Sequence, residues 1–491
     1  MSSTPSSHAA PVPLYRRIAD DLEELIHSGT LPPGSRLPSL RQTSRRRRVS
    51  VTTAMEAYRL LEDRGIVEVR PQSGHYVCLA AVRQPPEPER TATCREPAKV
   101  DTSRLMERVL DEASRPGLVV PFGAAVPHPD FLPTSRLNTL LSRALRREPV
   151  TSQVYGTVQG RLELRREIAR LAFDGGVTLT PDELVITTGA QEAIGLALRA
   201  VTKPGDTVAI ESPTYPGFLR VLESLHLKAR QIATDPREGI CLEALDEALE
   251  DRRPGHRLAA VLLVPNFGNP LGHRMAADDK LRLVRRLDDA EVPLIEDDTY
   301  GELPHVGSRP RTLRSFDEVG NVLLLSSFSK ILAPGLRVGW LAPGRYAENV
   351  LRLKYANTLA SATPTQMAIA EYLAAGRLPR HLRGLRRSFK DLTSRMITEV
   401  GEHFPAGTRV TRPSGGFVLW VEAPEGVDCL ALHQAALDEG ISIVPGPIFS
   451  PSGRYRHCLR LSCAVPWSDT VERAIRRVGE LASAQLEGAP R

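Results

Sequence analysis

The chain has 491 residues, of which 41% are hydrophobic and 25% charged, and its net charge at pH 7 is +6. It is too long for one ordinary core, so we expect a globular protein of two or three domains. No apolar run reaches the roughly 18 residues of a membrane-spanning helix, the N-terminus lacks a signal-peptide pattern, and the six scattered cysteines form no zinc-binding pair. These features predict a cytoplasmic protein without a membrane segment or a bound metal.

Residues 12–79 have the pattern of a small helical domain that ends in a hairpin. Helical spacing and β-type runs predict, in chain order, a helix over residues 14–26, a short helix that starts at Ser39, a longer helix from Ser50 to Gly65, and strands over residues 66–70 and 75–78. Three helices followed by a hairpin are the order of a winged helix-turn-helix domain.

The basic residues of this region are strongly clustered. Between Gly34 and Met55 there are six arginines and no acidic residue. They are Arg36, Arg41, Arg45, Arg46, Arg47 and Arg48. Such clustering is typical of phosphate binding, whereas a solvated basic face usually has acidic residues between the basic ones. We therefore expect nucleic acid as a partner of this domain.

Residues 80–117 differ in composition from the segments on either side. They are rich in Pro, Glu and Arg, most of all over residues 84–90, and they contain only a short helical pattern over residues 105–110. This composition favours a linker.

From residue 118 to residue 487, helical patterns alternate with apolar β-type runs. The predicted strands cover residues 183–186, 207–210, 258–264, 292–296 and 321–325. This alternation predicts an α/β domain with a largely parallel sheet and helices on both faces. In such a sheet, ligands bind at the carboxyl ends of the strands.

Lys330 is the most informative residue at these strand ends. It follows the apolar run over residues 322–325, and lysine is scarce, because only seven of the 64 basic residues are Lys. Burial and cationic neighbours lower the pKa of a lysine and expose the neutral amine, which can condense with an aldehyde cofactor. An arginine in its place would stay protonated. The alternative is a lysine at a strand end that simply reaches solvent.

Other strand ends carry residues that suit the same cofactor. Gly189 opens a helix whose N-terminus can meet a phosphate, and Tyr215 could cover a flat ring, although it could also serve packing alone. Asn269 places an amide at a strand end. Asp297 is a carboxylate that a protonated pyridine nitrogen would stabilise, while the neighbouring Asp298 could instead cap the following helix. With Arg337, this set supplies the elements of a pyridoxal phosphate (PLP) site.

Residues 118–487 resemble a class I aminotransferase of PLP fold type I, and residues 12–79 resemble a GntR-type winged helix. The combination resembles the MocR family of bacterial transcriptional regulators. The resemblance implies PLP as cofactor, double-stranded operator DNA as a partner, and PLP, an amine or an amino acid as effector. It also implies a homodimer that acts at the nucleoid in the bacterial cytoplasm.

The resemblance implies a role for each residue around the cofactor ring. Lys330 would bond covalently to the cofactor aldehyde, and Asp297 would pair with the pyridine nitrogen. Asn269 and Tyr300 would contact the phenolic oxygen, while Tyr215 would stack on the ring.

The resemblance also implies residues that hold the phosphate and the substrate. The phosphate would be bound by Gly189, Ala190, Gln191, Ser327, Ser329 and Arg337. Tyr155 would reach the phosphate of the second subunit, because sites in this fold lie at a dimer interface. Arg460 would bind the α-carboxylate of an amino acid through a bidentate contact.

In the DNA-binding half, the resemblance points to nine residues. They are Arg36, Ser39, Arg41, Ser50, Thr52, Thr53, Ser73, Gly74 and His75. Arg41 would contact phosphate, the hydroxyls at the start of the third helix would approach the major groove, and the hairpin tip could enter the minor groove.

The sequence departs from the family pattern in two features. Residues 45–48 replace small and apolar residues that usually end in Gly, and Val51 stands where many members have a polar base reader. These changes predict stronger phosphate affinity and weaker base readout.

Three functions are compatible with the sequence. The first is a PLP-dependent regulator in which an effector closes the second domain around Arg460 and changes the spacing of two DNA-binding heads. The second is an active aminotransferase with an appended DNA-binding domain. The third is a general nucleic-acid binder whose PLP site is vestigial. The complete cofactor set joined to a DNA-binding domain favours the regulator.

Overall fold

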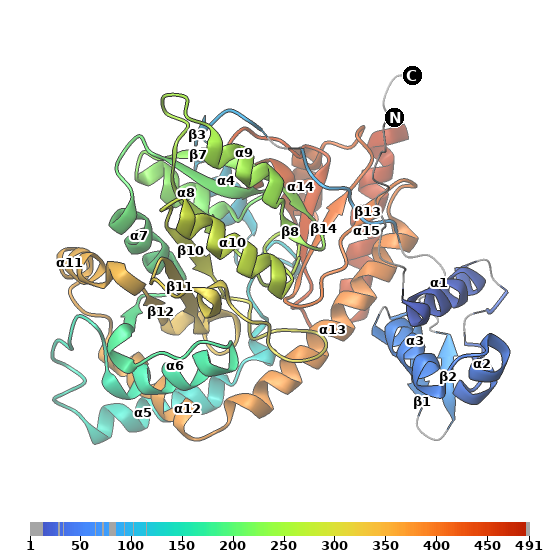
Figure 1. Ribbon diagram of the computed structural model, residues 1–491, viewed down its shortest axis with the longest axis horizontal. Coiled ribbons are helices and arrows are strands. Elements are labelled where there is room, and N and C mark those ends of the chain that lie inside the picture. Colours follow the sequence, from blue (N-terminus) through green and yellow to red (C-terminus); the bar gives the residue numbers. More distant parts are fainter. Residues whose placement is uncertain are drawn as a thin grey trace, which may run out of the picture. The chain divides into compact units, whose positions relative to one another are not determined.

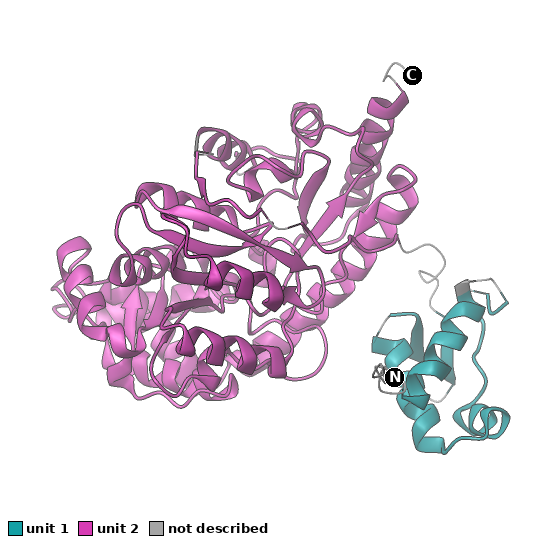
Figure 2. Ribbon diagram, turned by 45° about the horizontal axis from the view of Figure 1, so that its top comes forward, with its two compact units in different colours: residues 1–84 teal, residues 85–491 magenta. Residues whose placement is uncertain are grey.

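The computed structural model describes residues 13–27, 30–32, 34–63, 65–70, 73–77, 85–92, 94–101, 103–113 and 115–487. They form two compact units that divide between Gln84 and Pro85 (Figures 1 and 2). The predicted turn residues 71 and 72, and residues 12 and 78–84 at the predicted domain boundary, lie outside the described residues. In the described part of the chain, no helix is long and apolar enough to cross a membrane.

Unit 1 is a winged helix-turn-helix domain. It contains α1 (Leu14–His27), α2 (Leu40–Arg47), α3 (Val51–Asp63) and an antiparallel hairpin of β1 (Val67–Arg70) and β2 (Gly74–Val77). These elements confirm the order that the sequence predicts. The apolar stripe of α1 packs on α3 and on the hairpin, and the core includes Ile18, Leu22, Ile26, Ala57, Leu61, Val67 and Val77.

Tyr58 joins the parts of unit 1. The side chain is fully buried, and its hydroxyl donates a hydrogen bond of 2.7 Å to the carbonyl of Pro38. The hydroxyl of Thr43 on α2 lies 2.7 Å from the Tyr58 hydroxyl. The ring of His75, on the hairpin, packs edge-on with its centroid 4.9 Å from that of Tyr58. One α3 side chain therefore positions both α2 and the hairpin.

Unit 2 is built on a mixed nine-stranded sheet. Its strand order is β3 (Ala98–Lys99), β7 (Lys228–Asp235), β6 (Thr207–Ser212), β9 (Leu258–Leu263), β10 (Leu294–Asp297), β11 (Val322–Ser327), β12 (Gly339–Ala342) and β5 (Val185–Thr187), with β8 (Gly239–Ile240) paired to β7. In this order, the strands β7, β6, β9, β10 and β11 are parallel to one another, whereas β12 and β3 run antiparallel to their neighbours. The predicted largely parallel sheet is confirmed; β7 and β12 were not predicted, because β7 carries polar side chains and β12 is short.

Helices cover both faces of this sheet (Figure 1). Along β6, Val208 and Ile210 face α4 (Ser103–Ala113), α7 (Ala190–Val201) and α8 (Pro216–Ser224), while Ala209 faces α9 (Leu242–Glu250) and α10 (Ala277–Asp289). The remaining helices beside the sheet are α5 (Thr134–Arg147), α6 (Leu162–Asp174), α11 (Ala347–Asn357) and α12 (Thr363–Ala374).

The C-terminal part of unit 2 forms a small subdomain. Its antiparallel sheet has the order β13 (Arg409–Val410), β14 (Val418–Glu422), β17 (Cys458–Ser462) and β16 (Val444–Pro445). The short strands β4 (Val120–Pro121) and β15 (Ile441–Ser442) pair in parallel beside it. The helices α13 (Leu378–His403), α14 (Cys429–Asp438) and α15 (Asp469–Glu487) supply its core together with the sheet.

The structure differs from the predicted linker over residues 80–117. Residues 85–113 are part of unit 2, because β3 pairs with β7 and α4 buries Met106 and Val109 in the main core. The apolar stripe of α4 is narrow, and the many Pro, Glu and Arg residues of the whole stretch conceal it in the composition.

Arg48 gives a test of the unusual arginine run. It ends α2 in the left-handed conformation, with φ of 53°, where glycine is favoured. We expect Arg48→Gly to stabilise unit 1 by about 1 kcal/mol, measured as hydrogen-exchange protection of its amides in the full chain. Arg46→Gly removes the same charge within the helix and should instead destabilise it by about 1 kcal/mol. Equal protection of the two variants would contradict the strain at residue 48.

Candidate cofactor site and DNA-binding surface

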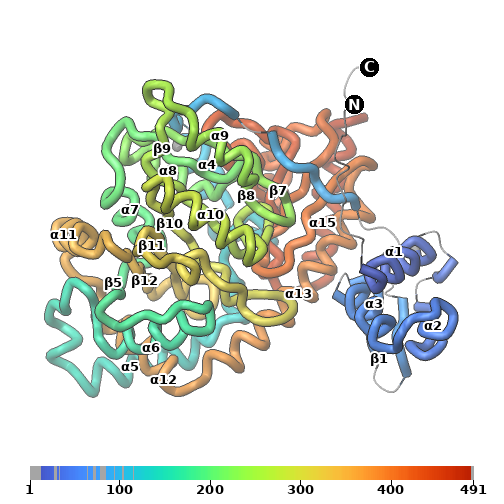
Figure 3. The backbone as a smooth tube through the Cα atoms, viewed as in Figure 1, coloured from blue at the N-terminus to red at the C-terminus, as the bar shows by residue number. Residues whose placement is uncertain are grey.

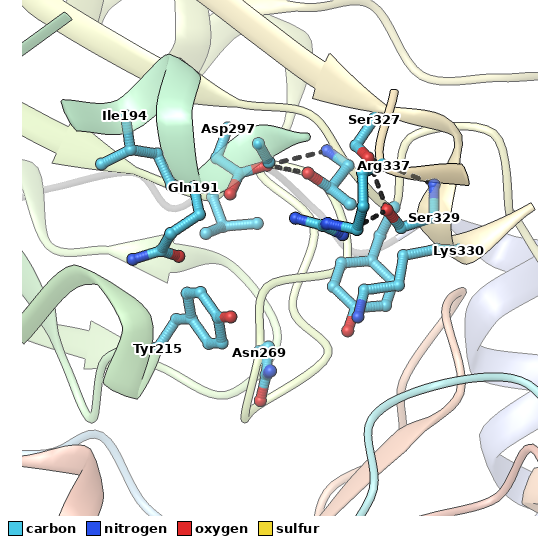
Figure 4. A pocket seen from close by; sticks show the side chains of 13 residues that line it. Gln191, Ile194, Tyr215, Asn269, Asp297, Ser327, Ser329, Lys330 and Arg337 are labelled. Atoms are coloured by element: carbon cyan, nitrogen blue, oxygen red, sulfur yellow. Dashed lines mark hydrogen bonds between the residues drawn. The ribbon is translucent and has the colours of Figure 1, made fainter. Parts of the chain in front are cut away.

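A pocket lies at the carboxyl ends of the parallel strands of unit 2 (Figure 4). It is lined by Ala190, Gln191, Ile194, Tyr215, Val264, Asn269, Asp297, Thr299, Tyr300, Ser327, Ser329, Lys330 and Arg337. The structure thus brings together the predicted cofactor residues except Tyr155 and Gly189, which are not in this lining. Ile194, Val264 and Thr299 were missed by the sequence analysis.

Lys330 ends the short helical turn that follows β11 and lines the pocket. Its Nζ donates a hydrogen bond of 2.6 Å to the carbonyl of Ala125. Loss of hydration and the nearby Arg460 lower the pKa of Lys330 from 10.5 to about 8, although Asp297 opposes this shift. The amine is therefore far more often neutral at physiological pH than that of a solvent-exposed lysine.

Asp297 is buried at the end of β10. Its Oδ1 accepts hydrogen bonds from the backbone N–H of Thr299, at 2.9 Å, and from the Thr299 hydroxyl. Burial raises the pKa of Asp297 to about 6, while these two hydrogen bonds oppose the rise. A cation beside the carboxylate would restore the charged form. Thr299 could have been found from sequence, because the side chain of an Asp in a turn often accepts a hydrogen bond from the backbone N–H two residues later.

Asn269 and Tyr300 present unpartnered polar atoms. Oδ1 of Asn269 and the hydroxyl of Tyr300 are buried without a hydrogen-bond partner. Burial raises the pKa of the Tyr300 hydroxyl, and Asn269 lies close enough to oppose that rise, although the two groups do not meet hydrogen-bond geometry. Since an unsatisfied buried polar atom is unfavourable by about 1–3 kcal/mol, a bound ligand with a polar atom between them would be stabilised.

The opposite end of the pocket is suited to an anion. The guanidinium of Arg337 donates to Ser329 Oγ, at 3.4 Å, and to the carbonyl of Thr188, at 3.2 Å. The hydroxyls of Ser327 and Ser329 lie 2.8 Å apart. Gly189, with φ of 84°, precedes α7, and a Cβ there would lie 2.5 Å from Arg337 Nη2. Only glycine therefore lets this cation approach the N-terminus of α7.

The absence of a side chain at Gly217 makes room for the Tyr215 ring. Tyr215 precedes α8, and a Cβ on Gly217 would lie 2.3 Å from its Cε1. The ring also packs edge-on against Phe218, with centroids 5.5 Å apart. Gln191 donates to the carbonyl of Gly217 at 3.1 Å, so the pocket residues hold the turn as well.

Arg460 and Tyr155 occupy contrasting positions. Arg460 lies on β17 with only 3% exposure, donates to the carbonyl of Gly123, and has no partner for its Nε. Burial lowers its pKa to about 10. No carboxylate in the described part of the chain forms an ion pair with it. Tyr155 is 84% exposed and lies outside the pocket.

Unit 1 presents its basic cluster to solvent. All six arginines of this cluster are exposed, and Arg47 pairs with Asp21 at 2.7 Å. The hydroxyls of Ser39 and Ser50 cap their helices, because Ser39 Oγ accepts from Gln42 N at 3.3 Å and Ser50 Oγ accepts from Thr53 N at 3.0 Å. Thr52 is exposed on the first turn of α3.

The predicted wing residues differ in orientation. Ser73 Oγ lies 2.6 Å from the Tyr76 hydroxyl, and the side chain of Arg36 lies beside Gly74, whose φ is 110°. The ring of His75 is directed to the core at Tyr58, so this residue supports the hairpin from within. Burial lowers its pKa accordingly.

The fold and the site define a PLP-type aminotransferase domain joined to a winged-helix domain. The sequence matches the family described as aminotransferase class I and II over residues 132–478 and the bacterial regulatory proteins of the gntR family over residues 14–77. The chain therefore belongs to the class I and II aminotransferase family and, with its GntR domain, is of the MocR type.

Similar proteins share one or both domains. The uncharacterized HTH-type transcriptional regulator YjiR of Escherichia coli is 38% identical over 96% of this chain and 99% of its own length. For YdcR of the same organism, described in the same words, the values are 39%, 96% and 99%. The structure of LysN, an α-aminoadipate aminotransferase from Thermus thermophilus complexed with N-(5'-phosphopyridoxyl)-L-leucine, has a TM-score of 0.72 and 27% identity over 78% of this chain and 95% of LysN.

The cofactor of this family is pyridoxal 5'-phosphate, and the residues of the pocket fit it. The unpartnered oxygens of Asn269 and Tyr300 suit a polar ring substituent. The space that a Cβ at residue 189 would fill leaves an anion cradle beside Arg337. Lys330 supplies an amine of lowered pKa at the same cavity.

Gly217→Ala tests the shape of this pocket. The new methyl group must displace the Tyr215 ring, so we expect PLP to bind about tenfold more weakly or worse, because overpacking of this kind costs about 1–3 kcal/mol. Absorbance titration of the apoprotein with PLP measures the affinity. Gly195→Ala is the matched control, since a Cβ there meets no atom within 4 Å. Unchanged affinity in Gly217→Ala would show that the ring position is irrelevant to binding.

Proposed function

We propose that this protein is a transcriptional regulator that binds operator DNA through residues 12–79 and senses PLP, an amine or an amino acid through residues 118–487. One observation carries the proposal: a pocket with the donor set for PLP and an exposed arginine cluster on a winged helix belong to one chain. The likeness to YjiR and YdcR over 96% of the chain supports it.

Within the proposal, each pocket residue contacts a different part of the cofactor. Lys330 binds the cofactor aldehyde, and the bound cofactor supplies an electrophilic, electron-withdrawing ring to which an amine can attach. Asp297 holds a proton at the ring nitrogen, while Asn269 and Tyr300 orient the phenolic oxygen. Tyr215 covers the ring and excludes water from one face.

Different arginines of the protein bind the phosphate of the cofactor and the effector. Arg337 and the N-terminus of α7, with Ser327, Ser329, Ala190 and Gln191, neutralise the phosphate. Arg460 remains as a buried guanidinium without a carboxylate partner, which favours an effector with a carboxylate. The protein would thus distinguish amino acids from simple amines at Arg460.

We further propose a homodimer. Tyr155 lies on the same stretch as Val150 and Val154, and these side chains are 84%, 73% and 55% exposed. Adjacent exposed apolar side chains are typical of an interface. A second subunit would cover them and place Tyr155 at its phosphate site. Two winged helices in one dimer would match an operator with two half-sites.

The pH dependence of PLP attachment tests the role of Lys330. Because only the neutral amine reacts and its pKa is lowered to about 8, attachment to the apoprotein should speed up about tenfold per pH unit below that pH and level off above it. Stopped-flow absorbance measures the rate. Arg460→Gln removes a neighbouring cation and should move the midpoint upward. A rate that still climbs well above pH 9 in the unmodified protein, as expected of an ordinary lysine of pKa 10.5, would refute the lowered pKa.

Sensing predicts that ligands change DNA binding. With a promoter fragment of an adjacent gene, we expect PLP or a cognate amino acid to change the affinity by about 5- to 150-fold, the usual range of coupling between sites, as measured by fluorescence anisotropy. Lys330→Ala should abolish this response, while Lys203→Ala, a change of an exposed lysine, should preserve it. A ligand-independent affinity combined with steady-state turnover of an amino donor and a 2-oxo acid would instead favour an aminotransferase, which the unpaired Arg460 also suits.

A further inference from the structure

Residues 85–92, here named the strap, run along the surface of unit 2 between its two parts. In Figure 3 they appear in light blue between the green segments of the large sheet and the red segments of the small subdomain. Hydrogen bonds join the strap to the small subdomain, namely Val410 N to Pro86 O (2.8 Å), Arg409 Nη1 to Glu89 Oε1 (2.7 Å), Arg412 Nη2 to Pro85 O (3.3 Å) and Arg454 Nη1 to Ala92 O (3.1 Å).

Thr91 joins the strap to the large sheet. Its backbone N–H donates to the carbonyl of Thr234 at 3.2 Å, and its hydroxyl accepts from Thr234 N at 3.0 Å. The hydroxyl proton is then free to donate to the carbonyl of Ser212, at 2.6 Å. One threonine side chain therefore connects the strap with the ends of both β7 and β6.

Ser212 starts the turn that carries the pocket tyrosine. It is the last residue of β6 and stands three positions before Tyr215, which lines the cofactor pocket. Other contacts fix the same residue, because Gln231 Nε2 donates to Ser212 Oγ at 2.8 Å and the Tyr455 hydroxyl lies 2.6 Å from that oxygen. These contacts hold the Ser212 side chain, while its carbonyl stands at the start of the turn that carries Tyr215.

The strap is not packed along its whole length. A cavity of about 470 Å³ is lined on one side by strap residues Pro88 to Thr91 and on the other by Trp420 and Tyr455. The strap therefore borders open space on the side of Trp420 and Tyr455. It also follows directly, in sequence, the segment that connects unit 2 to unit 1.

We propose that Thr91 is a positioning residue that couples the Tyr215 turn to the strap, and through the strap to the point at which the DNA-binding unit is attached. The inference rests on the proposed function and specifies the route of its regulation. When an effector changes the position of Tyr215, the Ser212 carbonyl moves with the turn. The bond to Thr91 transmits this movement, because the Thr91 hydroxyl on the strap donates directly to the Ser212 carbonyl.

Thr91→Val tests the route, since valine keeps the branched shape and removes both hydroxyl contacts. In the full-length, PLP-loaded protein we expect the ratio of operator affinities with and without an amino acid effector to fall about three- to tenfold toward unity, which corresponds to about one hydrogen bond. The visible circular dichroism of bound PLP should also change, because it reports the chiral surroundings that Tyr215 provides.

The controls separate the route from general damage. Thr91→Ser keeps the hydroxyl and should restore both readouts, and Thr398→Val removes a helix-surface hydroxyl that bonds to Ser394 O and should leave both unchanged. Thr91→Ala adds no bulk and replaces the valine variant if that variant unfolds. A wild-type affinity ratio and wild-type dichroism in both variants that lack the hydroxyl would overturn the inference.

The same experiment distinguishes this inference from the proposed function. If the unmodified protein binds operator equally with and without ligands, the sensing function fails. The dichroism then decides the structural link alone: a changed spectrum in Thr91→Val and a normal one in Thr91→Ser support the contact between strap and pocket, and identical spectra refute it.

Discussion

Three charged groups with little hydration, Asp297 and Lys330 from the large sheet and Arg460 from the small subdomain, lie close together in unit 2. The main effect of burial is to raise the pKa of Asp297 and to lower those of Lys330 and Arg460, so each group is pushed toward its neutral form. Their neighbours compensate only in part, through the Thr299 hydrogen bonds and two backbone carbonyls. PLP, with a ring nitrogen that can be protonated and an aldehyde, suits Asp297 and Lys330, and a carboxylate suits Arg460, which supports the proposed pairing of PLP with an amino acid effector.

The scaffold gives these groups their geometry by simple means. Parallel strands end at one edge of the sheet, so residues far apart in the chain meet there. Two positions without a side chain then shape the pocket. Gly189 admits the guanidinium of Arg337, and Gly217 admits the ring of Tyr215. The shape of the pocket thus depends on where a Cβ is missing as much as on which side chains are present.

The two units use electrostatics in opposite ways. Unit 1 exposes its arginines, where they remain hydrated and can exchange counterions with a phosphate backbone. Unit 2 buries Arg460, where a single carboxylate would be strongly preferred. The strap follows unit 1 in the chain and contacts two parts of unit 2. These are the small subdomain that carries Arg460 and, at Thr91, the residue that begins the turn before Tyr215. A small ligand can bias DNA binding only if such contacts differ between the free and bound states.

Local pattern was enough to determine much of this protein. The helices and hairpin of unit 1, the strands β5, β6, β9, β10 and β11, and the gathering of Lys330, Asp297 and Asn269 follow from periodicity and from the rule that parallel strands share an edge. Composition misled over residues 85–113, where a narrow apolar stripe docks α4 into the core. Only the tertiary structure decided that His75 faces Tyr58, that Gly217 makes room for Tyr215, and that Thr91 bonds to Ser212. The last contact joins residues 121 positions apart. The sequence could not reveal these contacts, because they depend on how separate elements pack, and such packing leaves no periodic trace along the chain.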